Sequence, residues 1–327
     1  MYILGIESSC DETAVAVVKD GNQVLSNCVY SQINAHKTKG GVVPDLASRL
    51  HCKHINPLIE KSLHDANLEW SNLDAIAVTQ GPGLEASLLV GISAAKTLAH
   101  CCQLPLIPVN HLHGHIYAHF LSVTPPSFPF ITLLVSGGNT LLCLVKNHYD
   151  FDLIGATRDD AAGEAFDKIG RYLGLGYPAG PKIERLANHA SDLKIPFPKP
   201  MLHDGLDFSF SGLKTAVMTY IDQNPDVAKE DICSNVQSTI IELLFHKSLS
   251  ACKQYDCFNL AITGGVAANQ TLSTYFSDHC KTEGLSFFGL PRNLCTDNAA
   301  MIATAAYYKA TFTTFNSSCE VNPSLTL

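Results

Sequence analysis

The sequence predicts an α/β protein that consists of two related domains. The chain has 327 residues, which suffices for two domains of roughly 150 residues each. Both halves begin with a strand–turn–strand–turn–strand pattern, and both continue with helices. This repeated order of elements predicts two α/β domains around a cleft.

The first half shows the pattern in its apolar runs and turn residues. Asp20-Gly21-Asn22 predicts a hairpin turn between two strands. Apolar residues at helical spacing predict a helix over 46–66, with Asp45 as its cap. The elements predicted here, in chain order, are strands at 2–7, 13–18 and 24–30, the helix at 46–66, a strand at 74–79, a helix at 87–102 and a short strand at 104–109.

The second half repeats this order of elements. The elements predicted here are strands at 128–138, 140–145 and 151–154, helices at 161–174 and 231–254, a strand that enters a Gly-Gly turn and a helix within 258–269, and a last helix from about residue 297. We expect an N-terminal domain at 1–109, joined by the last helix at about 297–327. The C-terminal domain is expected at 110–296.

Composition narrows the class of protein. The chain has 22 basic and 30 acidic residues and a net charge of −8, which excludes binding of nucleic acid through an overall positive field. A local basic strip or a basic partner subunit stays open. Charged residues make up 16% and hydrophobic residues 46% of the chain, which excludes extended disorder. The 12 cysteines form no CxxC pair, and neither an export signal nor a membrane span is predicted, so we expect a cytoplasmic protein.

Three turns that follow buried strands are candidates for phosphate binding. They are Ser8-Ser9, Ser136–Asn139 and Gly264-Gly265. Glycine lets backbone N–H groups approach an anion closely, and a helix after Gly265 would add a favourable dipole. One such turn is more often only a tight turn, but three in one chain favour a nucleotide clamped between domains. Neither a P-loop nor a GxGxxG fingerprint is present.

A histidine cluster at residues 111–119 predicts a metal site. On a helix, His111 and His115 share one face, whereas His113 points elsewhere. Core packing is the alternative interpretation, but four histidines within nine residues favour a metal. Asp297 is the candidate for a third, anionic ligand, although its place at the start of the last helix is equally typical of an N-cap. The HExxH pattern is absent, because position 112 is leucine.

Eight segments across nearly the whole chain resemble one known family. They read, in order, GIESSCDETAVAVV, GPGLEASLLVG, HLHGHIYAH, LLVSGGNT, DDAAGEAFDKIGRYLGLGYPAGP, FSFSGLKTAV, ITGGVAAN and CTDNAAMIA. Together they are similar to the universal tRNA threonylcarbamoyltransferase family, bacterial branch TsaD, formerly described as O-sialoglycoprotein endopeptidases. The resemblance implies an actin/hexokinase-like (ASKHA) duplicated two-domain α/β fold with an interdomain nucleotide cleft. It implies an acyltransferase that moves the threonylcarbamoyl group from threonylcarbamoyl-AMP to N6 of the adenosine 3′ of the anticodon, in tRNAs that read ANN codons.

The resemblance also assigns roles to individual residues. It implies one divalent metal ion per subunit, Fe²⁺ or Zn²⁺, bound by His111, His115 and Asp297. It implies substrate contacts from a larger set: Leu134, Val135, Ser136, Gly137, Gly138, Asp167, Gly180, Glu184 and Asn269. The family usually has glutamate where this chain has His113, and Asn139 replaces a histidine that is commoner in bacterial members. No general base is assigned.

The implied partners are tRNA, threonylcarbamoyl-AMP, a TsaB-like paralogue and a TsaE-like ATPase subunit, without a membrane. Two other enzyme classes are alternatives. A small-molecule kinase of the same superfamily would not be expected to need the paired histidines, and a metalloprotease would need a base beside the metal. A non-catalytic paralogue should lack the three proposed metal ligands, all of which are present.

Overall fold

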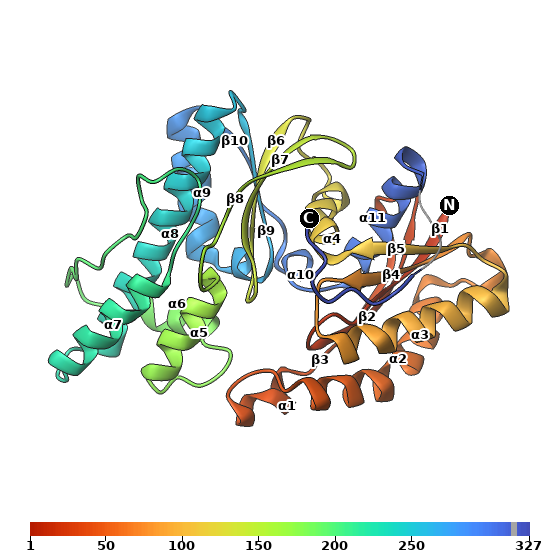
Figure 1. Cartoon of the computed structure of the whole chain (residues 1–327), viewed down its shortest axis with the longest axis horizontal. Helices are drawn as coiled ribbons and strands as arrows, with labels where there is room; N and C mark the ends of the chain where they lie inside the picture. The colour runs from red at the N-terminus through yellow and green to blue at the C-terminus, as the bar shows by residue number, and fades with distance from the viewer. Residues whose placement is uncertain (315–318) are drawn as a thin grey trace. The chain divides into compact units, whose positions relative to one another are not determined.

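The computed structural model describes residues 1–314 and 319–327 of the chain (Figure 1). It divides into two compact units. The first unit contains residues 1–125, 147–150 and 290–327, and the second contains residues 126–146 and 151–289. Each unit has one five-stranded sheet with helices packed on it.

The strands, in chain order, are β1 (Tyr2–Glu7), β2 (Glu12–Lys19), β3 (Gln23–Ser31), β4 (Ala75–Gly81), β5 (Leu106–Asn110), β6 (Phe130–Val135), β7 (Thr140–Asn147), β8 (Asp150–Ala156), β9 (Asn259–Thr263) and β10 (Ser286–Phe288). The α-helices are α1 (Ile33–His36), α2 (Pro44–Ala66), α3 (Glu85–Cys102), α4 (His111–Tyr117), α5 (Ala162–Tyr172), α6 (Gly180–Ala187), α7 (Ser211–Gln223), α8 (Lys229–Gln254), α9 (Gln270–Glu283), α10 (Arg292–Cys295) and α11 (Ala299–Phe312). Short 3₁₀ helices are η1 (Lys37–Lys39), η2 (Trp70–Asn72), η3 (Ala118–Leu121) and η4 (Gly265–Ala268).

The two sheets have the same order of strands. The first is β3-β2-β1-β4-β5, and the second, written in the matching direction, is β8-β7-β6-β9-β10. In both, the central strand pairs antiparallel with the next strand in the chain and parallel with a later one. The duplicated α/β plan predicted from the order of elements is therefore confirmed by the topology.

The central strand β1 of the first unit has two differently covered faces, because successive side chains of a strand alternate. Leu4 and Ile6 are fully buried in a core that includes residues of α2 and α3. Gly5 faces α11 instead, where a Cβ atom would lie 2.5 Å from the carbonyl oxygen of Ala299. The absence of a side chain at Gly5 lets the first turn of α11 lie directly on the sheet.

Helix α4 packs against α11 at a second glycine. A Cβ at Gly114 would lie 2.7 Å from Cδ1 of Ile302 and 3.2 Å from Cγ of Met301. Because of this packing, α4 and η3 belong to the first unit, whereas the sequence analysis begins the second domain at residue 110. Helix α11 also packs on β1, β2, β4 and β5 of the first unit.

Two helix starts differ from the sequence-based expectation. Asp45 does not cap α2, because Pro44 takes the first helical position and Val43 precedes it without a side-chain cap. The helix expected directly after Gly265 is only the short η4, and α9 begins at Gln270. Asn269 caps α9 with its side chain, so the glycine turn does not lie at the N-terminus of a long helix.

Among residues 1–314 and 319–327, none of the helices combines sufficient length with sufficient apolar character to cross a bilayer.

Replacing Gly114 by valine tests the close packing of α4 on α11. The branched side chain would meet Ile302 and Met301, and overpacking of this kind destabilises a protein by about 1–3 kcal/mol. Urea unfolding should show that loss for Gly114→Val. Gly114→Ala is the matched control, since its single methyl group meets the movable end of the Ile302 side chain. Equal stability of Gly114→Val and the unchanged chain would contradict the packing argument.

Candidate functional site

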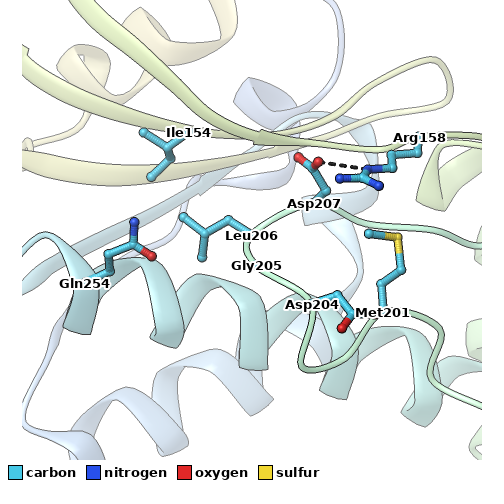
Figure 2. Close-up of a pocket in the computed structure, with 8 residues that line it drawn as sticks. All are labelled: Ile154, Arg158, Met201, Asp204, Gly205, Leu206, Asp207 and Gln254. Carbon is cyan, nitrogen blue, oxygen red and sulfur yellow. Dashed lines mark hydrogen bonds and ion pairs between the residues drawn. The ribbon is translucent and has the colours of Figure 1, made fainter.

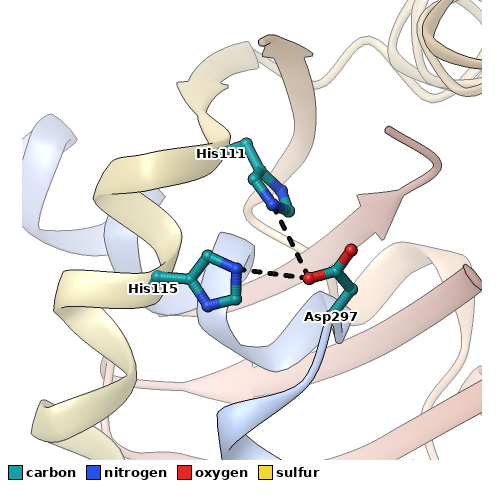
Figure 3. A group of neighbouring side chains, drawn as sticks. All are labelled: His111, His115 and Asp297. Atoms are coloured by element: carbon teal, nitrogen blue, oxygen red, sulfur yellow. Dashed lines mark ion pairs between the residues drawn. The ribbon is translucent and has the colours of Figure 1, made fainter. Parts of the chain in front are cut away.

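Three side chains of the first unit converge as the sequence analysis expects (Figure 3). His111 and His115 lie one turn apart on α4, and Asp297 comes from the segment that leads into α11. Oδ1 of Asp297 lies 3.6 Å from Nε2 of His111 and 3.2 Å from Nε2 of His115. The histidine rings are nearly buried, and Asp297 retains 21% side-chain exposure.

The alternative interpretation of Asp297 as an N-cap is wrong. The cap of α11 is the next residue, Asn298, whose side-chain oxygen accepts from the backbone N–H of Met301 at 3.0 Å. Its amide nitrogen donates to the carbonyl oxygen of Thr296 at 2.8 Å. The Asp297 carboxylate is thereby left to face the two imidazoles.

These three residues fit a divalent metal ion. Imidazole nitrogens and a carboxylate oxygen are ligands that Zn²⁺ and Fe²⁺ accept. Ligand atoms at about 2.1 Å from a tetrahedral ion lie about 3.4 Å from one another, and the 3.2 and 3.6 Å separations around Asp297 are close to that value. Three protein ligands are also the number that catalytic metal sites use while one position stays open.

Glu7, at the end of β1, holds His111 from behind. Its Oε2 lies 2.9 Å from Nδ1 of His111 and also accepts from the Thr79 hydroxyl at 2.6 Å. Oε1 accepts from the backbone N–H of Ser9. A carboxylate on one ring nitrogen selects the tautomer that leaves the other nitrogen free to bind a metal. No role is predicted for Glu7 from the sequence alone, although an acid at the end of an otherwise apolar strand can indicate a functional residue.

The electrostatics of the cluster are dominated by opposite charges at close range. Burial alone would lower the pKa of His111, but the carboxylates of Glu7 and Asp297 raise it to about 9. Burial would raise the pKa of Asp297, yet the two histidines lower it to about 2. In the metal-free chain both ring nitrogens of His111 therefore carry a proton at neutral pH, and a metal ion would have to displace one of these protons.

His113 lies on another side of α4, as predicted. Its ring meets the ring of Tyr149 edge to face, with 5.3 Å between centroids. Burial, with a smaller contribution from the positive charge of Lys309, lowers the pKa of His113 to about 4. The residue that departs from the usual family pattern is thus a neutral aromatic contact outside the metal cluster.

The glycine turns of the second unit offer open backbone. A Cβ atom at Gly137, Gly138 or Gly265 would meet nothing within 4 Å, and Gly137 and Gly138 are exposed. At Gly264, by contrast, φ is +94° and a Cβ would lie 2.3 Å from the carbonyl oxygen of Val135. Gly264 is therefore required by the fold, whereas the other three leave room for an anion. Leu134 and Val135, which lead into the first turn, are fully buried.

The third predicted turn, Ser8-Ser9, lies in the first unit beside the metal cluster. The Ser8 hydroxyl donates to the carbonyl oxygen of Ser87 at 2.9 Å, and the Ser9 N–H donates to Glu7. Both residues are buried. In this structure the turn therefore supports the histidine cluster through Glu7.

The remaining predicted substrate residues hold neighbouring backbone in the second unit. Oδ1 of Asp167 accepts from the N–H of Ala179, next to Gly180 at the start of α6. Oε1 of Glu184 accepts from the N–H of Gln270 at 2.6 Å. Asn269 caps α9 and also donates to Gln237 at 2.8 Å. Glu184 and Asn269 thus meet at the start of α9.

A separate pocket of about 540 Å³ lies in the second unit (Figure 2). Its lining residues are Ile154, Arg158, Met201, Asp204, Gly205, Leu206, Asp207 and Gln254. Arg158 pairs with Asp207 at 2.9 Å, and the buried ammonium group of Lys247 donates to backbone carbonyls of the 201–205 loop. None of the predicted site residues lines this pocket.

The sequence matches a known protein family over most of its length. The sequence model described as "TsaD: tRNA N6-adenosine threonylcarbamoyltransferase" matches residues 23–304. The chain belongs to the tRNA N6-adenosine threonylcarbamoyltransferase family. A relative from Staphylococcus epidermidis with that name is 50% identical over 311 residues, which covers 94% of this chain and 91% of the relative. One from Moorella thermoacetica is 48% identical over 312 residues and covers 94% and 91%. The family resemblance read from the eight segments is confirmed.

Solved structures support the fold at low sequence identity. The dehydratase component A of (R)-2-hydroxyglutaryl-CoA dehydratase from Acidaminococcus fermentans aligns with a TM-score of 0.57 at 15% identity, over 95% of this chain and 99% of that one. HypF from T. kodakarensis aligns with a TM-score of 0.63 at 16% identity, over 96% of this chain and 48% of that one. With the two matching sheets, these alignments confirm the duplicated actin/hexokinase-like α/β fold of the family.

Metal content of single variants tests the ligand set. His111→Ala, His115→Ala and Asp297→Ala should each lose most of the bound metal, because each removes one of three ligands. His113→Ala and His113→Glu should retain it, since position 113 faces Tyr149. Metal per chain, measured by elemental analysis of the purified variants, decides between the outcomes. Loss in the His113 variants alone would show that the ligand set is wrong.

Proposed function

We propose that this chain transfers the threonylcarbamoyl group from threonylcarbamoyl-AMP to N6 of the adenosine 3′ of the anticodon, in tRNAs that read ANN codons. The observation that carries the proposal is the convergence of His111, His115 and Asp297, backed by Glu7, in a member of this family. The reaction forms a bond from N6 to the carbamoyl carbon and breaks the bond from that carbon to the AMP phosphate oxygen.

The first unit contributes side-chain chemistry to this reaction. His111, His115 and Asp297 would hold one divalent ion, Fe²⁺ or Zn²⁺, and Glu7 keeps the His111 ring in the orientation that such binding needs. When bound, the ion would supply Lewis-acid stabilisation of negative charge on phosphate or carbonyl oxygen. An aromatic amine is a poor nucleophile, so residues that fix the reactants in place must supply much of the rate.

The second unit contributes main-chain groups to binding of the adenylate. We infer that the N–H groups of the open turns at Gly137, Gly138 and Gly265 donate to the phosphate of the adenylate. These glycines leave free the space in front of the turns that a Cβ atom would fill. Asp167, Glu184 and Asn269 support the proposal by holding the backbone at the starts of α6 and α9, and Gly180 is the first residue of α6. Leu134, Val135 and Ser136 lead into the first of these turns.

Partners are part of the proposal. The net charge of −8 gives the chain no long-range attraction for tRNA. We therefore propose that a TsaB-like paralogue and a TsaE-like ATPase work with this chain and help it to bind tRNA. Since tRNA is the proposed substrate, the reaction is expected in the cytoplasm.

A reconstituted transfer assay tests the function directly. The purified chain is incubated with threonylcarbamoyl-AMP, unmodified tRNA and TsaB-type and TsaE-type proteins, and the digested tRNA is analysed by mass spectrometry. We expect N6-threonylcarbamoyladenosine in the complete mixture and none when Asp297→Ala replaces the unchanged chain. Phosphorylation of a small sugar or acid by the chain with ATP, without modified tRNA, would favour the kinase alternative. Cleavage of a glycoprotein instead would favour the protease.

Substitution of the open glycines tests the adenylate site. Gly137→Val and Gly265→Val should abolish binding of the adenylate, because the side chain would occupy the space in front of the N–H groups. The fold should persist, since a Cβ there meets nothing within 4 Å. Isothermal titration measures the affinity, and circular dichroism checks the fold. Gly264→Val is the matched contrast and should unfold this region. Unchanged nucleotide affinity in both open-turn variants would remove the argument.

A further inference from the structure

The segment at residues 319–327, here called the strap, lies across the ends of the parallel strands β4 and β5. It begins at Cys319, which is buried in the core of the first unit. The N–H of Asn322 donates to the carbonyl oxygen of Gln80 at 3.0 Å, and the N–H of Gly83 donates to that of Pro323 at 3.2 Å. The side chain of Asn110 then donates to the carbonyl oxygen of Thr326 at 2.7 Å. We propose that the strap positions the metal-binding helix α4 through Asn110.

The strap is built closely into the first unit. A Cβ atom at Gly81 would lie 1.8 Å from the carbonyl oxygen of Asn322 and 3.3 Å from Cβ of Leu325. The absence of a side chain at Gly81 is therefore what lets the strap reach the end of β4. Its hydrogen bonds to Gln80 and Gly83 fix it independently of Asn110.

Asn110 connects the strap to the first ligand. Its Oδ1 accepts from the N–H of Leu112 at 2.8 Å, which caps α4, while its Nδ2 serves Thr326. A carbonyl oxygen can only accept, so the strap selects the amide orientation in which Oδ1 faces the helix. His111 follows Asn110 directly.

A helix as short as α4 depends on such a cap. It has seven residues, and helices of this length are marginal without stabilising ends. The ring of His111 must keep one nitrogen on Glu7 and the other toward Asp297, so the first turn has little freedom. Loosening the strap should therefore weaken metal binding although no ligand changes. This inference rests on the metal role in the proposed function.

The test compares three variants of the otherwise complete chain. Deletion of Thr326–Leu327 removes the Thr326 carbonyl and keeps the hydrogen bonds of Asn322, Pro323 and Leu325. Asn110→Ser keeps a side chain that caps helices well, but it is shorter than asparagine and should lose the bond to Thr326. The third variant combines the two changes. Thr326→Ala is the matched control, because only the backbone oxygen of Thr326 is used.

Two measurements are made on each variant. Hydrogen exchange at the Leu112 N–H of the metal-free chain should become about fivefold faster in the deletion, the size of a typical cap contribution. The dissociation constant for Zn²⁺, measured against a competing chelator, should rise about tenfold, as for changes behind a ligand. The combined variant should match the single ones, because both remove the same tether. Thr326→Ala should match the unchanged chain.

Unchanged Leu112 exchange in the deletion would overturn the inference, and so would additive losses in the combined variant. These outcomes are separate from failure of the proposed function. If the chain binds Zn²⁺ with the expected dependence on the strap but produces no modified tRNA, the proposed transferase function is refuted. The inference that the strap positions α4 would still hold.

Discussion

The contact of Asp297 with two imidazoles depends on how closely α11 can approach its neighbours. Gly5 lets the start of α11 lie on β1, and Gly114 lets α4 lie on α11. A side chain at either position would push α11 away from β1 or α4, and with it the segment that carries Asp297. The convergence of these three side chains is thus a result of helix packing, and they come from segments that are almost two hundred residues apart in the chain.

Both elements that present ligands are fixed by an asparagine next to the ligand. Asn110 precedes His111 and caps α4, and Asn298 follows Asp297 and caps α11. The amide nitrogen of each asparagine also donates to a backbone carbonyl oxygen. A capping side chain with two bonds has one orientation, so the neighbouring ligand is held by backbone geometry as well as by its charge partners.

Local patterns in the sequence were sufficient for most elements and for selecting the three proposed ligands, which lie close together in the structure. Strand runs, helical spacing and the His111–His115 interval are short-range features, and the structure reproduces them. The acid at the end of β1 is visible in the sequence, but its partner His111 is a tertiary neighbour, and so are the residues that Gly114 approaches. The cap assignments failed for a local reason: α2 begins at Pro44 after Val43, without a side-chain cap, and Asn298 caps α11 in place of Asp297. Packing of α4 on α11 is likewise a tertiary feature that the sequence does not reveal.

The duplicated sheet has a consequence for how the two copies tolerate mutation. Glu7 ends the central strand of one copy, and Val135 ends the central strand of the other. At the first position the identity of the side chain matters, because its carboxylate orients a ring. After the second position it is the absence of side chains that matters for the proposed adenylate site, because the turn exposes backbone. The same place in one topology therefore depends in the first copy on a particular functional group, and in the second copy on the absence of added volume.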